Sequence, residues 1–361
     1  DSNLFPAGFN NLGEVAKEKG SKAFQEFLSQ FDSKEVLIVP EAHTRNLFYL
    51  SNLCAIKSLL TDAGYNVTLG SIREDIDETL TVKDAQDHDL ILEKMQNKDC
   101  HIQTKSFKEG IVLLNNDFSV ENPPLLDSCC QPIIPPAKLG WAHRKKTTHQ
   151  KHFDTLITDF CTALDIDPWL LSTIHTEVEN VNFKEKETLE RVGKAVDETI
   201  AKIQEKYHQY NIKEKPYVFV KDNSGTYGMG ILSVSSGDEI ISLNSEKRGK
   251  MVKGKQQSLI QSVIIQEGVP TAQQVGDAPA EPVMYSVGGQ IIGGFMRVHP
   301  SKDTQLSLNA PGMKFDMLLE TKMTKPLREH VSQEDELSLY MVLGDIANLA
   351  IALEYKQVMN K

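Results

Sequence analysis

The first half of the chain alternates short apolar runs with longer helical patterns. A mixed apolar and charged pattern from Asn11 to about Phe31 predicts a helix, and the run VLIVP at 36–40 predicts a buried strand that ends at proline. A helical pattern over 44–63 stops at Gly64, and NVTLGS at 66–71 predicts the next strand. Strand, helix and strand at this spacing predict a βαβ unit, and therefore a parallel sheet.

The pattern changes in the second half. The proline-rich segment 123–136 predicts an irregular connection, and helices are predicted over 153–164 and 185–210. From residue 217 onward, short β-branched and apolar runs are separated by glycine and polar clusters, which is typical of strands in one mainly antiparallel sheet. A final helix over 333–355 has apolar residues at helical spacing and is expected to pack across that sheet.

These patterns predict more than one domain. A chain of 361 residues exceeds the size at which one core usually keeps growing, and clefts between domains are where small ligands bind. We expect an α/β (α+β) fold, with a parallel α/β domain over 1–150 and a domain with a mainly antiparallel sheet and flanking helices over 151–361.

Composition narrows the class of partner. A formal net charge of -11 argues against nucleic acid, because binding phosphate backbones requires a basic surface. No apolar run approaches the roughly 18 residues that span a bilayer, and the first residues do not form a leader, so we expect a cytoplasmic protein with no membrane partner. The odd cysteine count and the absence of a CxxC motif favour reduced thiols, with Cys129 and Cys130 as small buried residues.

The most informative segment is YVFVKDNSGTYGMGI at 217–231. A strand ends in Lys221, a glycine-rich turn follows and a second strand begins, a pattern that matches neither a Walker loop nor a Rossmann turn. Glycines let backbone N–H groups approach phosphate oxygens, and the lysine adds a compact positive charge. A plain β-hairpin with a flexible tip has the same glycines, so that alternative stays open. The residues predicted to bind a triphosphate are Lys221, Ser224, Gly225, Thr226, Tyr227, Gly228 and Gly230.

Further candidates follow along the same half of the chain. The strand IIQEGV ends in polar residues that could hold a nucleotide base and ribose, namely Gln266, Glu267 and Val269. Arg297 at the end of a strand could stabilise charge during phosphoryl transfer, and Glu281 and Asn309 could hold Mg²⁺. Any strand can carry an exposed arginine or glutamate, and any strand end can be capped by solvated polar groups, so these alternatives also stay open.

Polar residues follow two of the predicted parallel strands. Because ligands bind beyond the carboxyl ends of such strands, substrate contacts are predicted at Arg45, Asn46, Asn115 and Asn116. Arg144 lies in the most basic short stretch of the chain, at 141–149, which favours either a pocket for an anion or a solvated loop.

Several motifs, in the same order, resemble those of the proteobacterial glutamate-cysteine ligases, which have an ATP-grasp nucleotide site. They cover essentially the whole chain: NLFPAGFNN at 3–11, PEAHTRN at 40–46, LLNND at 113–117, DIDPWL at 165–170, VKDNSGTYGMGI at 220–231 and LNAPGMKF at 308–315. The resemblance departs at Met284, where ATP-grasp proteins often carry arginine, and the late acidic-x-Asn pair and a segment ahead of NLFPAGFNN are missing.

The resemblance implies that ATP, L-glutamate and L-cysteine give gamma-glutamylcysteine, the first step of glutathione biosynthesis, with Mg²⁺ as cofactor. Lys221 and Arg297 would be catalytic, the second domain would be ATP-grasp-like, and Arg45 or Arg144 would bind the glutamate alpha-carboxylate. Two other readings remain: an ATP-grasp ligase for a different amino acid or peptide pair, and a nucleotide-binding protein without turnover. A homo-oligomer is also left open.

Overall fold

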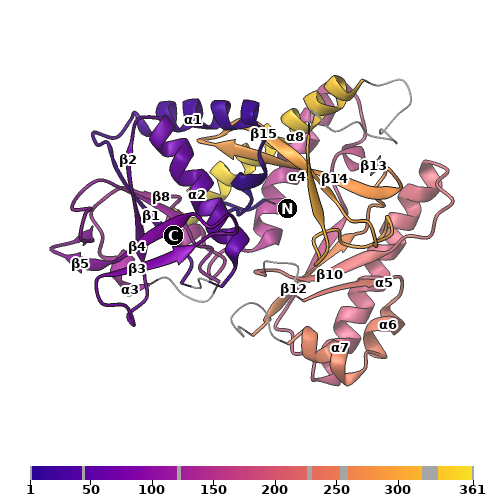
Figure 1. The fold of residues 1–361 in the computed structure, drawn as a ribbon. Coiled ribbons are helices and arrows are strands. Elements are labelled where there is room, and N and C mark those ends of the chain that lie inside the picture. Colours follow the sequence, from indigo (N-terminus) through magenta and orange to yellow (C-terminus); the bar gives the residue numbers. More distant parts are fainter. Residues whose placement is uncertain are drawn as a thin grey trace.

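The computed structural model describes residues 2–42, 45–119, 123–225, 230–252, 259–318 and 332–359. Figure 1 shows an N-terminal lobe on one side, a second lobe around α5 (Lys186–Gln209) on the other, and α4 (Lys146–Leu164), β14 (Ala278–Val287) and β15 (Gln290–Val298) between them. Segments from both ends of the chain therefore meet in the middle of the molecule.

The N-terminal lobe is built on the predicted parallel sheet. Its six strands run in the order β3-β4-β2-β1-β7-β8, and every neighbouring pair is parallel except β3 with β4. The prediction of βαβ units is confirmed, although the β3–β4 hairpin was not anticipated. The strands are β1 (Glu35–Pro40), β2 (Asn66–Ser71), β3 (Thr79–Lys83), β4 (Asp89–Lys94), β7 (Ile111–Asn115) and β8 (Ile133–Ile134).

Helices and two further short strands complete this lobe. Asn46 caps the first long crossover helix, because its side chain accepts the Tyr49 N–H at 3.2 Å. The proline-rich connection at 123–136 was predicted to be irregular, but it contains one helical turn and the two-residue strand β8. The elements are η1 (Phe9–Asn11), α1 (Glu14–Leu28), α2 (Leu47–Asp62), β5 (Gln96–Lys98), β6 (His101–Gln103), α3 (Pro124–Asp127) and η2 (Ala137–Leu139).

The strands of the second half form two sheets, so the prediction of a single sheet was wrong. One has the order β11-β10-β12-β9 and packs on α5, and the other has the order β13-β14-β15-β16. Similar apolar runs occur on both sides of the break at Gly268, so the sequence did not reveal which strands pair. The remaining elements are η3 (Pro168–Leu170), β9 (His175–Glu179), β10 (Val218–Asp222), β11 (Ile231–Val234), α6 (Gly237–Ile241), α7 (Ser245–Lys250), β12 (Ser262–Glu267), β13 (Gln274–Val275), β16 (Lys314–Met317) and α8 (Gln333–Met359).

One hydrophobic core joins the N-terminal lobe to the second of these sheets. Phe9 packs edge-on against Tyr285, with ring centroids 5.0 Å apart, and both belong to the same buried cluster as Val36 and Phe295. Helix α1 lies against β14 and β15. The core therefore crosses the domain boundary expected near residue 150, and that boundary stays a prediction.

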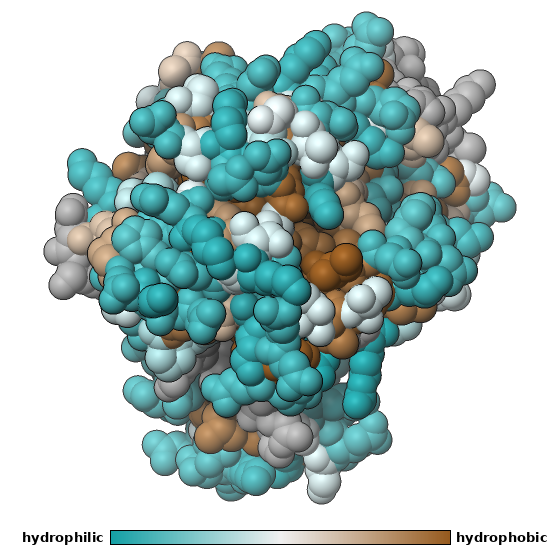
Figure 2. Space-filling view, turned by 60° about the vertical axis from the view of Figure 1, so that its left-hand side comes forward, coloured by the Kyte–Doolittle hydropathy of each residue, from teal (hydrophilic) through white to brown (hydrophobic). Residues whose placement is uncertain are grey.

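Helix α8 packs on α4 and on β14 and β15, as a helix crossing the sheet was expected to do. Residues 334–359 are long and apolar enough to span a bilayer, and 17% of their most apolar window is buried. The prediction that no apolar run approaches the length of a membrane span was therefore wrong. Polar residues scattered along this helix interrupt its apolar pattern in the sequence. Core helices of soluble proteins meet the same criterion, so the indication is weak. On the face in Figure 2, hydrophilic side chains surround a central apolar hollow.

The structure also corrects the prediction that every thiol is reduced. Cys100 and Cys130 form a disulfide, and the Cys130 N–H donates to the Cys100 carbonyl at 2.8 Å. The side chain of Gln131 fixes the same two segments, since its Oε1 accepts the Ile102 N–H at 2.6 Å. Sequence spacing could not reveal that the β5–β6 turn meets the connection before β8. Cys54, Cys129 and Cys161 are free thiols.

Candidate nucleotide and substrate site

Strand alternation sets the direction of Lys221. Val218 and Val220 on β10 point into the core over α5, so Lys221 points from the opposite face of the sheet. Its Nζ donates to Gln266 Oε1 at 2.6 Å, and Gln266 in turn donates to Thr173 Oγ1 at 2.9 Å. Burial lowers the pKa of Lys221 to about 8. The structure thus brings together two of the predicted nucleotide-binding residues.

The described part of the glycine-rich loop packs against the start of α4. The Asn223 side-chain oxygen accepts the Thr147 N–H at 3.0 Å, and its backbone carbonyl accepts the Lys146 N–H at 2.8 Å. Ser224 Oγ donates to the Arg144 carbonyl at 3.0 Å. A Cβ at Gly225 would lie 2.7 Å from the Asp222 carboxylate, so this position needs glycine.

Four other residues of this loop were also predicted to bind a triphosphate. Gly230 has φ +62°, in the left-handed region, where β11 begins. Thr226, Tyr227 and Gly228 lie outside the described residues. The predicted contact of these three residues with a triphosphate therefore stays a prediction.

Lys146 is a site residue that the sequence reasoning did not single out. Its Nζ donates to the Asp222 carbonyl at 2.8 Å and also contacts the Gly225 carbonyl. Burial lowers its pKa to about 7, which the charge of Asp222 partly offsets and the nearby Lys221 and Arg144 reinforce. The consecutive basic residues in WAHRKK were the available signal.

Lys146 and the nearby Lys221 lie at the N-terminus of α4, where the helix dipole disfavours positive charge. The N-terminus of α4 already carries a partial positive charge, and Lys146 is its first residue. Adding Lys146 and the neighbouring Lys221 raises the positive potential at this point, which a bound anion would offset. The arrangement is therefore suited to phosphate.

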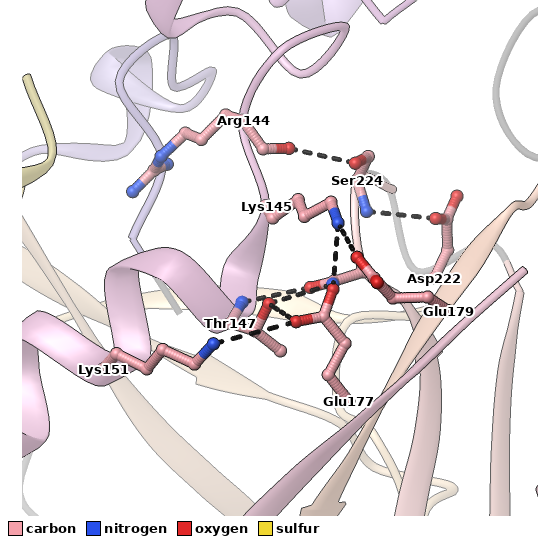
Figure 3. Close-up of polar contacts among 9 residues, drawn as sticks. Arg144, Lys145, Thr147, Lys151, Glu177, Glu179, Asp222 and Ser224 are labelled. Atoms are coloured by element: carbon pink, nitrogen blue, oxygen red, sulfur yellow. Dashed lines mark hydrogen bonds and ion pairs between the residues drawn. The ribbon is translucent and has the colours of Figure 1, made fainter. Parts of the chain in front are cut away.

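A carboxylate on the edge strand β9 ties α4 to the loop, as Figure 3 shows. Glu177 accepts hydrogen bonds from Lys145 Nζ at 3.1 Å, Thr147 Oγ1 at 3.0 Å and Asn223 Nδ2 at 2.8 Å. Lys151 Nζ lies 4.0 Å from the same carboxylate. Glu177 thus holds the first turn of α4 and the loop after β10 in one polar network.

Arg144 has partners other than a substrate. Its Nε donates to both oxygens of Glu354, at 2.8 and 3.0 Å, and each side chain is 1% exposed. Its Nη1 and Nη2 donate to the carbonyl and hydroxyl of Ser2, at 2.8 and 2.6 Å. In Figure 3 its side chain points away from Glu177. Arg144 therefore joins Ser2 near the N-terminus and Glu354 of α8 to the start of α4. Of the two predicted arginines, Arg45 is then the better candidate for binding the substrate carboxylate.

The Glu267 carboxylate also accepts hydrogen bonds from other parts of the protein. Both of its oxygens accept from Trp169 Nε1, at 3.1 and 3.0 Å, and Oε2 accepts the Ile174 N–H at 3.0 Å. Burial raises its pKa. The carboxylate holds the DIDPWL segment against β12, and its predicted contact with a ribose stays a prediction. Val269, in contrast, is 59% exposed.

The predicted catalytic arginine and one predicted metal ligand are neighbours. Arg297 Nη1 lies 2.9 Å from Glu281 Oε1 across the paired strands β14 and β15. The Arg297 Nε atom is buried and has no hydrogen-bond partner among the described residues. Asn309 is partly buried in the connection between β15 and β16. A carboxylate and an amide oxygen are the kind of ligands that Mg²⁺ takes, so the residue types fit this ion.

The asparagines at the edge of the parallel sheet hold backbone segments in place. Asn115 Nδ2 donates to the Pro6 carbonyl at 3.0 Å, and its Oδ1 accepts from Asn52 at 3.1 Å. Asn116 Nδ2 donates to the Pro40 carbonyl at 3.2 Å. They support the edge at which a ligand was predicted. Of the predicted substrate contacts there, Arg45 is exposed beside the cap of α2.

Comparison with known proteins gives one strong agreement. The family model described as glutamate-cysteine ligase matches residues 1–355. A solved structure from Methylobacillus flagellatus, described as a putative gamma-glutamylcysteine synthetase, shares 34% identity at a TM-score of 0.89, covering 99% of this chain and 85% of that chain. D-alanyl-alanine synthetase A from Vibrio cholerae, at 11% identity and a TM-score of 0.42, covers 89% of this chain and 82% of that chain and supports no argument. No curated protein sequence matches.

Proposed function

Because the chain belongs to the glutamate-cysteine ligase family, an ATP-dependent class of enzyme, we propose that Lys221, Lys146 and the loop at 222–225 bind the ATP triphosphate. The observation that carries this proposal is that two half-buried lysine side chains and a helix N-terminus lie together beside one glycine-containing loop. Each of these features is suited to phosphate, and together they make up a nucleotide site of the ATP-grasp kind. Gln266 and Val269 line the path to the adenine base.

The reaction follows from the chemistry of the ligands. A gamma-carboxylate oxygen of glutamate forms a bond to the terminal phosphorus of ATP, and the bond from that phosphorus to ADP breaks. The cysteine amine then attacks the acyl carbon, phosphate leaves with the carbon–oxygen electron pair, and the amine loses its proton. These steps require positioning and charge neutralisation, with no nucleophile from the protein.

Lys221 and Arg297 neutralise the charge that builds up on the transferred phosphoryl group. Arg297 has a buried Nε that the described residues leave unsatisfied, which an oxygen of the substrate or phosphate would satisfy. Glu281 and Asn309 would hold Mg²⁺, which supplies further positive charge to the phosphates when it is bound. We place the reaction in the cytoplasm, where ATP and free cysteine are available.

Arg45 binds the alpha-carboxylate of glutamate in this proposal. It is exposed beyond the carboxyl end of β1, where open parallel sheets bind their ligands, whereas the buried Arg144 pairs with Glu354. A guanidinium group pairs with a carboxylate through two hydrogen bonds, so this residue type is appropriate.

The test is a coupled ADP-release assay with mass detection of the product. We expect ADP release to require glutamate and cysteine together, with gamma-glutamylcysteine as the product. Lys221→Met and Lys146→Met should lower kcat/KM by about 100-fold or more, since each removes a charge contact to phosphate. Lys194→Met, on the exposed face of α5, is the matched control. Turnover with a different amino-acid pair would favour another ligase, and ATP binding without turnover would contradict the proposal.

A further inference from the structure

A cysteine, an aspartate and a histidine lie together in the N-terminal lobe, outside the proposed nucleotide site. Cys54 is on the second turn of α2, and Asp84 and His88 belong to the turn between β3 and β4. The thiol sulfur, a carboxylate oxygen and a ring nitrogen all lie within 4.8 Å of one another. Three different types of metal ligand therefore converge from two separate elements.

Asp84 is held rigidly at the centre of this group. Its side chain is 1% exposed, and Oδ1 accepts the backbone N–H groups of Gln86 at 2.8 Å and His88 at 3.0 Å. Oδ2 accepts from Ser51 Oγ at 3.0 Å and lies 3.3 Å from His88 Nδ1. One oxygen thus fixes the turn, while the other faces the thiol and the imidazole. A ligand held in this way is organised before a cation arrives.

A thiolate sulfur, an imidazole nitrogen and a carboxylate oxygen are the three ligand types that zinc takes in proteins. A bound cation would offset the negative charge of the thiolate and of Asp84. The residue types and their separations of at most 4.8 Å therefore favour ligation of a metal ion.

The dimensions are also compatible with a metal centre. Zinc takes sulfur at about 2.3 Å and nitrogen or oxygen at about 2.0–2.2 Å in tetrahedral geometry, so its ligand atoms lie roughly 3.5 Å apart. The three atoms here lie within 4.8 Å of one another, and the His88 side chain is 62% exposed. The exposed side of the group leaves a fourth position for water.

We propose that Cys54, Asp84 and His88 form a binding site for a divalent cation of the zinc class, with water as the fourth ligand. Because the ligands come from α2 and from the β3–β4 turn, the bound cation clamps the hairpin at the sheet edge to the helix that begins beside Arg45. The site is independent of the ligase chemistry proposed above.

Anaerobic cobalt titration of the full chain without added reductant, which leaves the Cys100–Cys130 disulfide intact, tests the proposal. We expect one equivalent to bind, with a thiolate-to-cobalt charge-transfer band and the visible bands of a tetrahedral centre, and zinc should displace it. Cys54→Ser should abolish the charge-transfer band, and His88→Ala should weaken cobalt affinity about tenfold or more. The matched controls Cys129→Ser and His101→Ala remove a thiol and an imidazole elsewhere and should behave as the parent protein does.

Two results would overturn the proposal: no charge-transfer band in the parent protein, or a band that survives in Cys54→Ser. If Cys54→Ser folds poorly, His88→Ala still decides the question, because its exposed side chain contributes little to the core. Unchanged cobalt affinity in that variant counts against the site. ADP release measured without added zinc or cobalt reports on the ligase alone, so the two proposals fail separately.

Discussion

The buried pair between Arg144 and Glu354 allows a quantitative prediction about stability. The two side chains are each 1% exposed and join the start of α4 to the end of α8. Glu354→Ala leaves a guanidinium group buried without its counter-charge, with Ser2 as a remaining partner. Breaking a buried pair in this way costs about 3–5 kcal/mol of unfolding free energy.

Urea unfolding followed by tryptophan fluorescence measures this loss. The Trp141 ring centroid lies 4.9 Å from the Arg144 guanidinium carbon, so the signal reports the region directly. With a urea m-value of about 3 kcal/mol/M, the unfolding midpoint should fall by about 1–1.7 M. Replacing both charges, in Arg144→Met with Glu354→Leu, should recover much of the loss because no uncompensated charge remains.

The pH dependence of this variant gives a second check. Burial alone would raise the pKa of Glu354, but the His149 ring nitrogen 3.6 Å away and the charge and hydrogen bonds of Arg144 bring it below its usual range. A depressed carboxyl pKa contributes stability that is present above the unfolded pKa and is lost as pH falls through the folded pKa. The difference between the parent and Glu354→Ala should therefore shrink in acid. A midpoint within about 0.2 M of the parent at neutral pH, with a raised glutamate KM for Arg144→Met, would instead make Arg144 a substrate residue.

Three further predictions concern the proposed active site. Glu177→Gln should raise the KM for ATP by about tenfold with an unchanged urea midpoint, because it weakens the tie between α4 and the loop; an unchanged KM would remove Glu177 from the positioning of that loop. Burial lowers the pKa of Lys146 to about 7 and that of Lys221 to about 8, so the ATP KM of the parent should rise as pH increases through this range; Lys221→Arg should remove the part of the rise near pH 8 because arginine keeps its charge, and parallel profiles would refute this. Arg45→Ala should raise the glutamate KM about tenfold or more and leave the ATP KM alone, and equal effects on both would refute the assignment.

Much of the architecture was predictable because local patterns determined it. The apolar strands at 36–40 and 66–71 lie on either side of a helix that ends at Asp62, and their parallel pairing follows from the crossover. The direction of Lys221 follows from strand alternation, because its neighbours Val220 and Asp222 are buried.

Other features depend on contacts between distant residues and left little local signal. Strand β9 has the sequence HTEVE, which is too polar for a buried-strand pattern, yet it supplies Glu177 at the sheet edge. Arg144 and Glu354 are 210 positions apart, so neither reveals its partner. The same holds for the contact between Glu267 and Trp169, which only tertiary packing determines.

The most direct test of the central claim is a crystal structure with a non-hydrolysable ATP analogue and Mg²⁺. The account predicts phosphate oxygens within about 3 Å of the ammonium groups of Lys221 and Lys146, with the described loop residues 222–225 alongside the triphosphate. A nucleotide bound elsewhere, with both ammonium groups still contacting only protein atoms, would contradict it.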